Sequence, residues 1–167
     1  MAGNAYLTRM PLGIAGAITR PRDLTVEPVT LDHTKPFRSY GLVGKYDSEK
    51  FVPLEDGDTL DKVKGILVRP YPTTSQADLV YLGVQANQIG DNLKRGYLCV
   101  KATAGNAATV KKGDPVYVRI AGGTEASPVG SFVLVQDANA ANTPQLVNAE
   151  VMGVGEADGR VEIAYNI

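Results

Sequence analysis

The chain has 167 residues, a length that suits one domain with its own core and leaves room for an additional extended segment. Its 17 basic and 18 acidic residues give a formal net charge of −1, so no overall positive field attracts nucleic acid or anionic lipid. The single cysteine, Cys99, excludes an internal disulfide and a zinc site built from several cysteines. The longest uncharged apolar stretch, residues 11–18, is too short to cross a membrane. We therefore expect a soluble protein with neither a nucleic-acid nor a membrane partner.

The first 36 residues differ in pattern from the rest of the chain. Prolines and glycines, among them Pro11, Gly13 and Pro21, interrupt an apolar and basic sequence that has neither a helical period nor a sustained strand period. Such a segment is typical of an extended arm that lies on a partner. The start of the chain also lacks the pattern of a secretory signal, which favours intracellular synthesis. The sequence thus predicts an N-terminal arm over residues 1–36 and a β-rich domain over residues 37–167.

The second part of the chain contains short β-rich segments separated by turn residues. A hairpin is predicted at residues 40–54, with Asp47 and Ser48 in its turn. The strand candidates, in chain order, are 50–54, 65–71, 79–84, 96–102, 115–120, 131–136, 149–154 and 160–167. A helix is tempting only at 85–96, where an internal glycine limits it to a turn or two. This spacing predicts a mainly β fold with little helix, a compact antiparallel β-sandwich or β-barrel carrying an extended N-terminal arm.

The segment VKKGDPVYVRIAGG, residues 110–123, raises the question of a phosphate site. A phosphate-binding loop needs a longer glycine-rich stretch that opens a helix, whereas here a β-favouring run follows the glycine. Val116, Val118 and Ile120 alternate with aromatic or polar residues, which is the period of a half-buried strand. We interpret the segment as a turn and a strand, with the lysines on a solvated rim.

Residue combinations that could carry catalysis or bind a metal are few. His33, the only histidine, follows Asp32, but adjacent residues on an extended chain point in opposite directions and no nucleophile motif accompanies them. The acidic residues within 54–61 lack the ligand spacing of an EF-hand and indicate a turn with solvated carboxylates. GVGEADG, residues 153–159, precedes a strand pattern and predicts a hairpin turn. We therefore predict a protein that is not an enzyme, with no catalytic, metal-binding or cofactor-binding residues.

The order of six segments along the chain carries a family resemblance. These segments are MPLGIAGAITRPRDLTVEPVTLD, FRSYGLVGKYDSEKFVPL, GILVRPYPTT, LKRGYLCVK, VKKGDPVYVR and VMGVGEADGRVEIAYNI. Together they resemble the cement or decoration proteins of tailed bacteriophage heads, from about Pro11 to the C-terminus. The order of the set carries the resemblance, because single turn-strand combinations occur widely.

The resemblance implies a non-enzymatic structural protein of the virion, without a cofactor. Such a protein binds the outer surface of the expanded capsid and stabilises the shell against internal DNA pressure by bridging neighbouring capsid subunits. The implied partners are the major capsid protein and further copies of the chain, often as a homotrimer and in some members as a dimer. The implied location is the outer surface of the virion, after synthesis in the cytoplasm of the bacterial host.

The predicted contacts with the capsid or with a neighbouring subunit lie on the N-terminal arm. They are its apolar and basic residues, namely Leu7, Arg9, Leu12, Ile14, Ile18, Arg20 and Arg22. Each contact is expected to be weak, and many symmetry-related copies would act together.

Two other functions remain open from the sequence. Another virion component, such as a tail or baseplate β module, would share this composition. A carbohydrate-binding β-sandwich would stack surface tyrosines on sugar rings, and the chain has eight tyrosines. That function requires a cluster of exposed aromatic rings, and tryptophan is missing.

Overall fold

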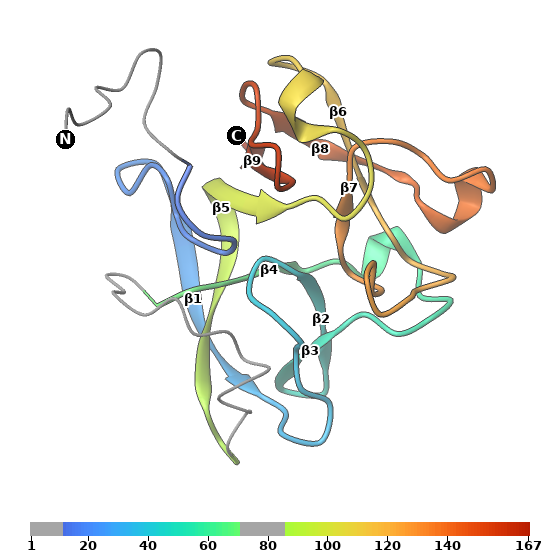
Figure 1. Cartoon of the computed structure of the whole chain (residues 1–167). Helices are drawn as coiled ribbons and strands as arrows, with labels where there is room; N and C mark the ends of the chain where they lie inside the picture. Colours follow the sequence, from blue (N-terminus) through green and yellow to red (C-terminus); the bar gives the residue numbers. More distant parts are fainter. Residues whose placement is uncertain (1–11, 71–85) are drawn as a thin grey trace, which may run out of the picture.

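The computed structural model describes residues 12–70 and 86–167, in which nine strands form one continuous sheet (Figure 1). The strands are β1 Thr25–Leu31, β2 Val43–Asp47, β3 Lys50–Pro53, β4 Gly65–Val68, β5 Ile89–Lys101, β6 Pro115–Val118, β7 Phe132–Val133, β8 Gln145–Val151 and β9 Arg160–Tyr165. The helices within these ranges are 3-10 turns at Leu60–Lys62, Ala107–Thr109 and Ala140–Asn142. None of them is long and apolar enough to span a membrane. The predicted mainly β fold with little helix is confirmed.

The sheet closes on itself twice around the long strand β5. The N-terminal half of β5 belongs to a first ring in the order β1-β3-β2-β4-β5, which the pairing of β5 with β1 closes. The C-terminal half belongs to a second ring with β9, β8, β6 and β7, which a bridge between Ala102 and Phe132 closes. The two groups of strands lie toward opposite ends of β5 (Figure 1). Of the two predicted architectures, the closed rings correspond to the barrel.

Strand directions follow the predicted antiparallel pattern with one exception. The pairing of β1 with β3 is parallel and covers two residue pairs, Thr30 with Lys50 and Leu31 with Phe51. The other pairings between named strands are antiparallel. The parallel contact is possible because a long connection, residues 32–42, separates β1 from the hairpin.

A local irregularity lets β5 serve both rings. Thr25 pairs with Arg95 whereas Val26 pairs with Leu93, so Lys94 is an extra residue on the β5 side. Such a bulge bends a strand and increases its twist. Gly96 follows with a φ of +147°, a conformation that L side chains rarely adopt. The bulge and the glycine together redirect β5 from the first ring into the second.

Two apolar clusters fill the rings. Leu31, Phe37, Phe51 and Leu67 belong to the cluster inside the first ring. The larger cluster fills the second ring and continues onto the outer face of the first ring, where residues such as Ile66 belong to it. Because this second cluster touches both rings, the rings are packed as one unit.

Several turns predicted from the sequence are confirmed. β2 and β3 form the predicted hairpin, with Ser48 at a φ of 56° in its turn. The turn before β6 has Gly113 at a φ of +87°, and the Lys111 N–H donates to the Asp114 carboxylate at 2.7 Å. β8 and β9 form the hairpin predicted at residues 153–159. The strand predicted at 79–84 lies outside the described residues.

Two segments of the sequence take a different structure from the predicted one. Residues 25–31, which we included in the arm, form β1 and pair with β5 in the first ring. Residues from Ile89 onward, where a helical turn was tempting, form the start of β5 between β1 and β4. In both cases, backbone pairing with strands distant in the sequence outweighs a weak local preference.

The interior of the first ring leaves no room for a side chain at Gly44. A Cβ atom there would lie 2.5 Å from Cζ of Phe51 and 2.7 Å from Cζ of Phe37. We expect Gly44→Ala to lower the free energy of unfolding by about 1–3 kcal/mol, because the two stacked rings must shift. Chemical denaturation measures this change. Gly153→Ala is the matched control, since nothing lies within 4 Å of its Cβ position, and equal losses in both variants would contradict the account.

Candidate interaction surfaces

Part of the N-terminal segment, residues 16–19, lies beside the second half of β5 as an additional extended stretch. The backbone of residues 16–19 pairs with that of residues 97–99: the Gly16 N–H donates to the Cys99 carbonyl at 2.7 Å, and the Cys99 N–H donates to the Ala17 carbonyl at 2.9 Å. β9 pairs with the same stretch of β5. This part of the predicted arm is therefore an element of the folded body, and its backbone groups have partners within the chain.

A carboxylate on β9 fixes the end of this stretch. Glu162 accepts a hydrogen bond of 2.6 Å from the Thr19 hydroxyl and two hydrogen bonds of 3.0 Å from the Arg20 guanidinium. The same guanidinium lies 4.2 Å from the centroid of the Tyr97 ring. Two parallel hydrogen bonds to one carboxylate are a specific geometry, and the ring adds a cation-π contact.

Two residues that we predicted to contact the capsid, Ile18 and Arg20, contact other residues of this chain. Ile18 packs against the larger apolar cluster and forms a bridge with Leu98. Arg20 binds Glu162, although its side chain is 46% exposed. These contacts explain why the residues are apolar and basic without requiring a partner protein.

The remaining predicted contacts are spread along the segment. Leu7 and Arg9 lie outside the described residues. Leu12 and Ile14 are partly buried, and Arg22 is exposed without an ion pair to any residue that the structure describes. The role of these residues at a capsid surface stays a prediction.

Removing the carboxylate of Glu162 should loosen the stretch that it holds. We expect Glu162→Ala to raise the hydrogen-exchange rates of the Gly16 and Thr19 amides by about tenfold, because charge-assisted hydrogen bonds disappear. Hydrogen exchange followed by NMR measures these rates. Glu150→Ala removes an exposed carboxylate from β8 and should leave both rates unchanged. Protection of the two amides that is the same in Glu162→Ala and in the native protein would refute this role of Glu162.

The structure shows the surroundings of His33, which we considered as a catalytic residue, and of the single cysteine, Cys99. The His33 side chain is 50% exposed, and its Nδ1 lies 3.9 Å from Oδ1 of Asp32. That carboxylate accepts hydrogen bonds from the N–H and the hydroxyl of Thr34, which lower its pKa. Cys99 is fully buried, and burial raises the pKa of its thiol to about 11. A buried thiol with a raised pKa has little thiolate at neutral pH and is therefore unreactive.

The acidic segment 54–61 contains a buried ion-pair network. We expected solvated carboxylates, but the Asp58 side chain is 6% exposed. It accepts hydrogen bonds from Lys45 at 2.6 Å, Lys62 at 2.7 Å and the Glu55 N–H at 2.8 Å. Burial alone would raise the pKa of this carboxyl, but the lysines and the N–H lower it to about 2. Within the described ranges, no group of three or more metal-ligating side chains occurs, here or elsewhere.

The low pKa of Asp58 predicts how stability depends on pH. Because the folded-state pKa lies below the unfolded value of about 3.8, the carboxylate stabilises the fold above about pH 4 and loses this effect as the pH falls toward 2. We expect Asp58→Asn to lower the unfolding free energy at pH 7 by about 2 kcal/mol and to flatten the loss between pH 4 and 2. Denaturant titrations at several pH values test this expectation. Glu49→Gln, on the turn between β2 and β3, is the control. An unchanged pH dependence in Asp58→Asn would contradict the assignment.

Arg119 is a buried residue that the sequence pattern did not reveal. It alternates with Val118 and Ile120 in a segment predicted to be half-buried, on the face opposite those apolar residues, yet its side chain is 8% exposed. The guanidinium donates to the Asp137 carboxylate at 2.6 and 3.0 Å and to the Ser127 hydroxyl at 2.8 Å. Its partner lies 18 residues away in the sequence, so no local pattern could indicate the pair. The pair fixes the loop that follows β6.

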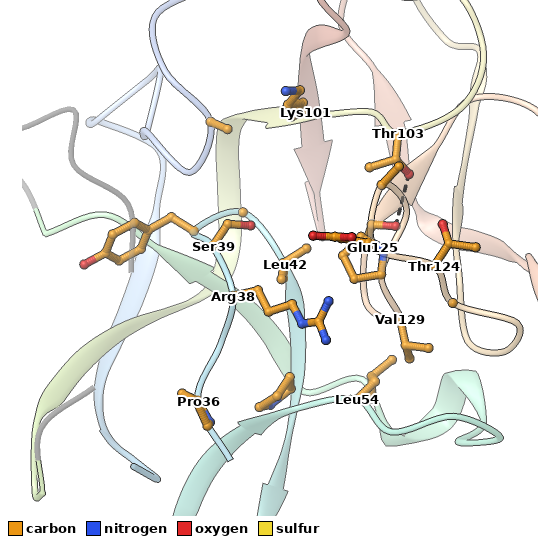
Figure 2. Close-up of a pocket in the computed structure, with 18 residues that line it drawn as sticks. Pro36, Arg38, Ser39, Leu42, Leu54, Lys101, Thr103, Thr124, Glu125 and Val129 are labelled. Carbon is orange, nitrogen blue, oxygen red and sulfur yellow. Dashed lines mark hydrogen bonds between the residues drawn. The ribbon is translucent and has the colours of Figure 1, made fainter. Parts of the chain in front are cut away.

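That loop forms one wall of a groove between the two rings (Figure 2). The groove has a volume of about 1050 Å³, and the loop before β2, residues 36–42, forms the opposite wall. Leu42, Leu54 and Val129 contribute apolar surface. The Thr103 hydroxyl, bonded to Ser131 at 3.1 Å, adds a polar group.

Three charged side chains line the groove. Arg38 reaches into it from the loop before β2, while Glu125 extends from the opposite wall (Figure 2). Lys101, at the end of β5, stands at a third side. None of these three forms an ion pair or a side-chain hydrogen bond with a residue in 12–70 or 86–167, and all three are exposed. Sequence reasoning missed this groove because its walls come from different rings.

Comparison with known proteins identifies the relatives of this fold. A family model described as the XM1 gp53 minor capsid protein matches residues 3–165. A chain in a solved structure of the capsid of Myoviridae phage XM1 is similar in fold, with a TM-score of 0.65 and 19% sequence identity. The similarity covers 99% of this chain and 98% of that chain. A search of curated proteins finds no match.

The family match over nearly the whole length defines the class of protein, a structural protein of the phage virion. The chain belongs to the XM1 gp53 minor capsid protein family. The resemblance to capsid-associated proteins of phage heads, drawn from the order of the sequence segments, is confirmed.

Proposed function

We propose that this protein binds the outer surface of the expanded phage capsid and stabilises the shell by bridging neighbouring capsid subunits, without catalysing a reaction. The observation that carries the proposal is the anchoring of residues 16–19 on β5 in a member of a minor capsid protein family. We assign the contact with the capsid to residues 1–11, which include Leu7 and Arg9. The major capsid protein is the proposed partner of this segment.

The two-ring body suits a load-bearing role on a shell. Both rings are closed by backbone hydrogen bonds and share a packed core, so deforming one ring disturbs the other. Copies arranged on the capsid lattice, which we propose to be homotrimers, would combine many weak contacts into a strong attachment. The shell would then resist rupture although no single contact is strong.

The carbohydrate-binding alternative finds little support in the exposed side chains. Tyr46 is the only aromatic residue among the exposed large hydrophobic side chains that the structure describes, and it is 40% exposed. Its hydroxyl contacts Glu27 and Asn92, and Lys94 lies 5.0 Å from its ring centroid. A platform for sugar rings requires several exposed rings together.

The proposal is tested with undecorated, expanded heads of the phage. We expect the full chain to add regular density to the outside of the heads in cryo-electron microscopy and to raise the temperature at which they rupture. A chain without residues 1–11 should keep its fold, because the described backbone pairing begins at Gly16, and should bind heads about tenfold more weakly. Its circular dichroism spectrum and melting temperature check the fold.

Two outcomes would contradict the proposal in different ways. Heads that stay bare at saturating full chain would refute binding to the outer surface and favour a tail or baseplate location. Full occupancy by the shortened chain would refute the role of residues 1–11 while leaving decoration itself intact.

A further inference from the structure

We propose that the groove between the two rings binds an extended segment of a partner protein, in which an acidic side chain stands beside apolar ones. This inference rests on the proposed function, in which the partner is a protein of the capsid shell. It assigns the contact to Arg38, Lys101 and the apolar surface between them, whereas the proposed function assigns a contact to residues 1–11.

The shape of the groove suits a chain segment. Its volume of about 1050 Å³ exceeds that of most small-molecule sites, which enclose about 300–1000 Å³ and bury most of the ligand. Here Arg38, Lys101, Thr124 and Glu125 are all exposed, so the space is a trough that is open to solvent. An extended peptide can lie in such a trough without having to enter a closed cavity.

The charges of the groove select an acidic partner. Two cations, Arg38 and Lys101, face one carboxylate, Glu125, and none of the three has an ion pair within the described residues. By contrast, Lys35 and Lys45, which share Glu55, each pair with two carboxylates. An exposed guanidinium offers a planar pair of donors that matches a carboxylate, and the excess of positive charge favours an acidic side chain over a basic one.

The apolar surface of the groove favours apolar residues on either side of the acidic residue in the partner segment. Leu42 and Leu54 are buried at its base, and Val129 is partly buried on its wall. Pro36 and Pro128 add further apolar surface on opposite sides. A segment with apolar side chains next to its acidic residue would cover this surface, and removing that surface from water favours binding.

The walls of the groove are fixed before a partner arrives. Arg119 holds the loop after β6 through Asp137 and Ser127. The Ser127 hydroxyl also lies 2.7 Å from that of Thr103, which ties this loop to the chain that follows β5. A preorganised groove loses little conformational entropy when it binds.

Charge reversal in the groove tests the inference. Undecorated expanded heads are the probe, and the binding of Arg38→Glu/Lys101→Glu is compared with that of the native chain. We expect the double variant to bind at least about tenfold more weakly, because two attractive charges become repulsive. Lys111→Glu/Lys112→Glu changes the net charge equally on the turn before β6 and should bind like the native chain. Melting temperatures verify that both variants fold, as expected for exposed side chains.

The outcomes separate this inference from the proposed function. If the native chain and both variants bind heads equally, the groove is not the contact, although the decoration of heads stands. If the native chain does not bind heads, the proposed function fails. Cross-linking in intact virions then tests whether the groove binds a partner protein. A photoreactive amino acid in place of Thr124 should then cross-link to an acidic segment of another virion protein. Cross-links that are absent, or that stay within copies of this chain, would overturn the inference.

Discussion

The structure depends on one strand that belongs to two closed rings. β5 pairs with β1 and β4 over its first half and with β9 over its second half. The change of ring requires the bulge at Lys94 and the unusual backbone of Gly96. Because both rings use the same strand, neither can open without disturbing the other, and their shared apolar cluster reinforces this coupling.

This arrangement also explains where the two candidate interaction surfaces lie. The N-terminal stretch runs beside the second half of β5, where Glu162 on β9 can reach it. The groove opens where the loops of the two rings approach each other, near the end of β5 at Lys101. Both surfaces therefore depend on how the rings are joined. Under the proposed function, in which the protein binds a shell under tension, contacts placed on its most constrained elements are an advantage.

Some charged residues have partners inside the fold, whereas others are exposed and can contact a partner protein. Asp58 and Arg119 are buried and have several partners, so they hold loops in place. Arg38, Lys101 and Glu125 are exposed and have no ion pair within the described part of the chain. The near-zero net charge of the whole protein conceals this difference, because it counts both kinds of residue alike.

The sequence by itself determined the features that arise from neighbouring residues. The β-rich character and the hairpin between β2 and β3 follow from alternation and turn chemistry over a few residues. Only the tertiary structure decided that residues 25–31 form a strand, that Arg119 is buried and that Arg38 faces Glu125 across a groove. Each of these depends on a partner that is distant in the sequence, and the closure of the rings selects that partner. Local patterns carry no information about such pairings, because strand pairing and burial are properties of the assembled sheet.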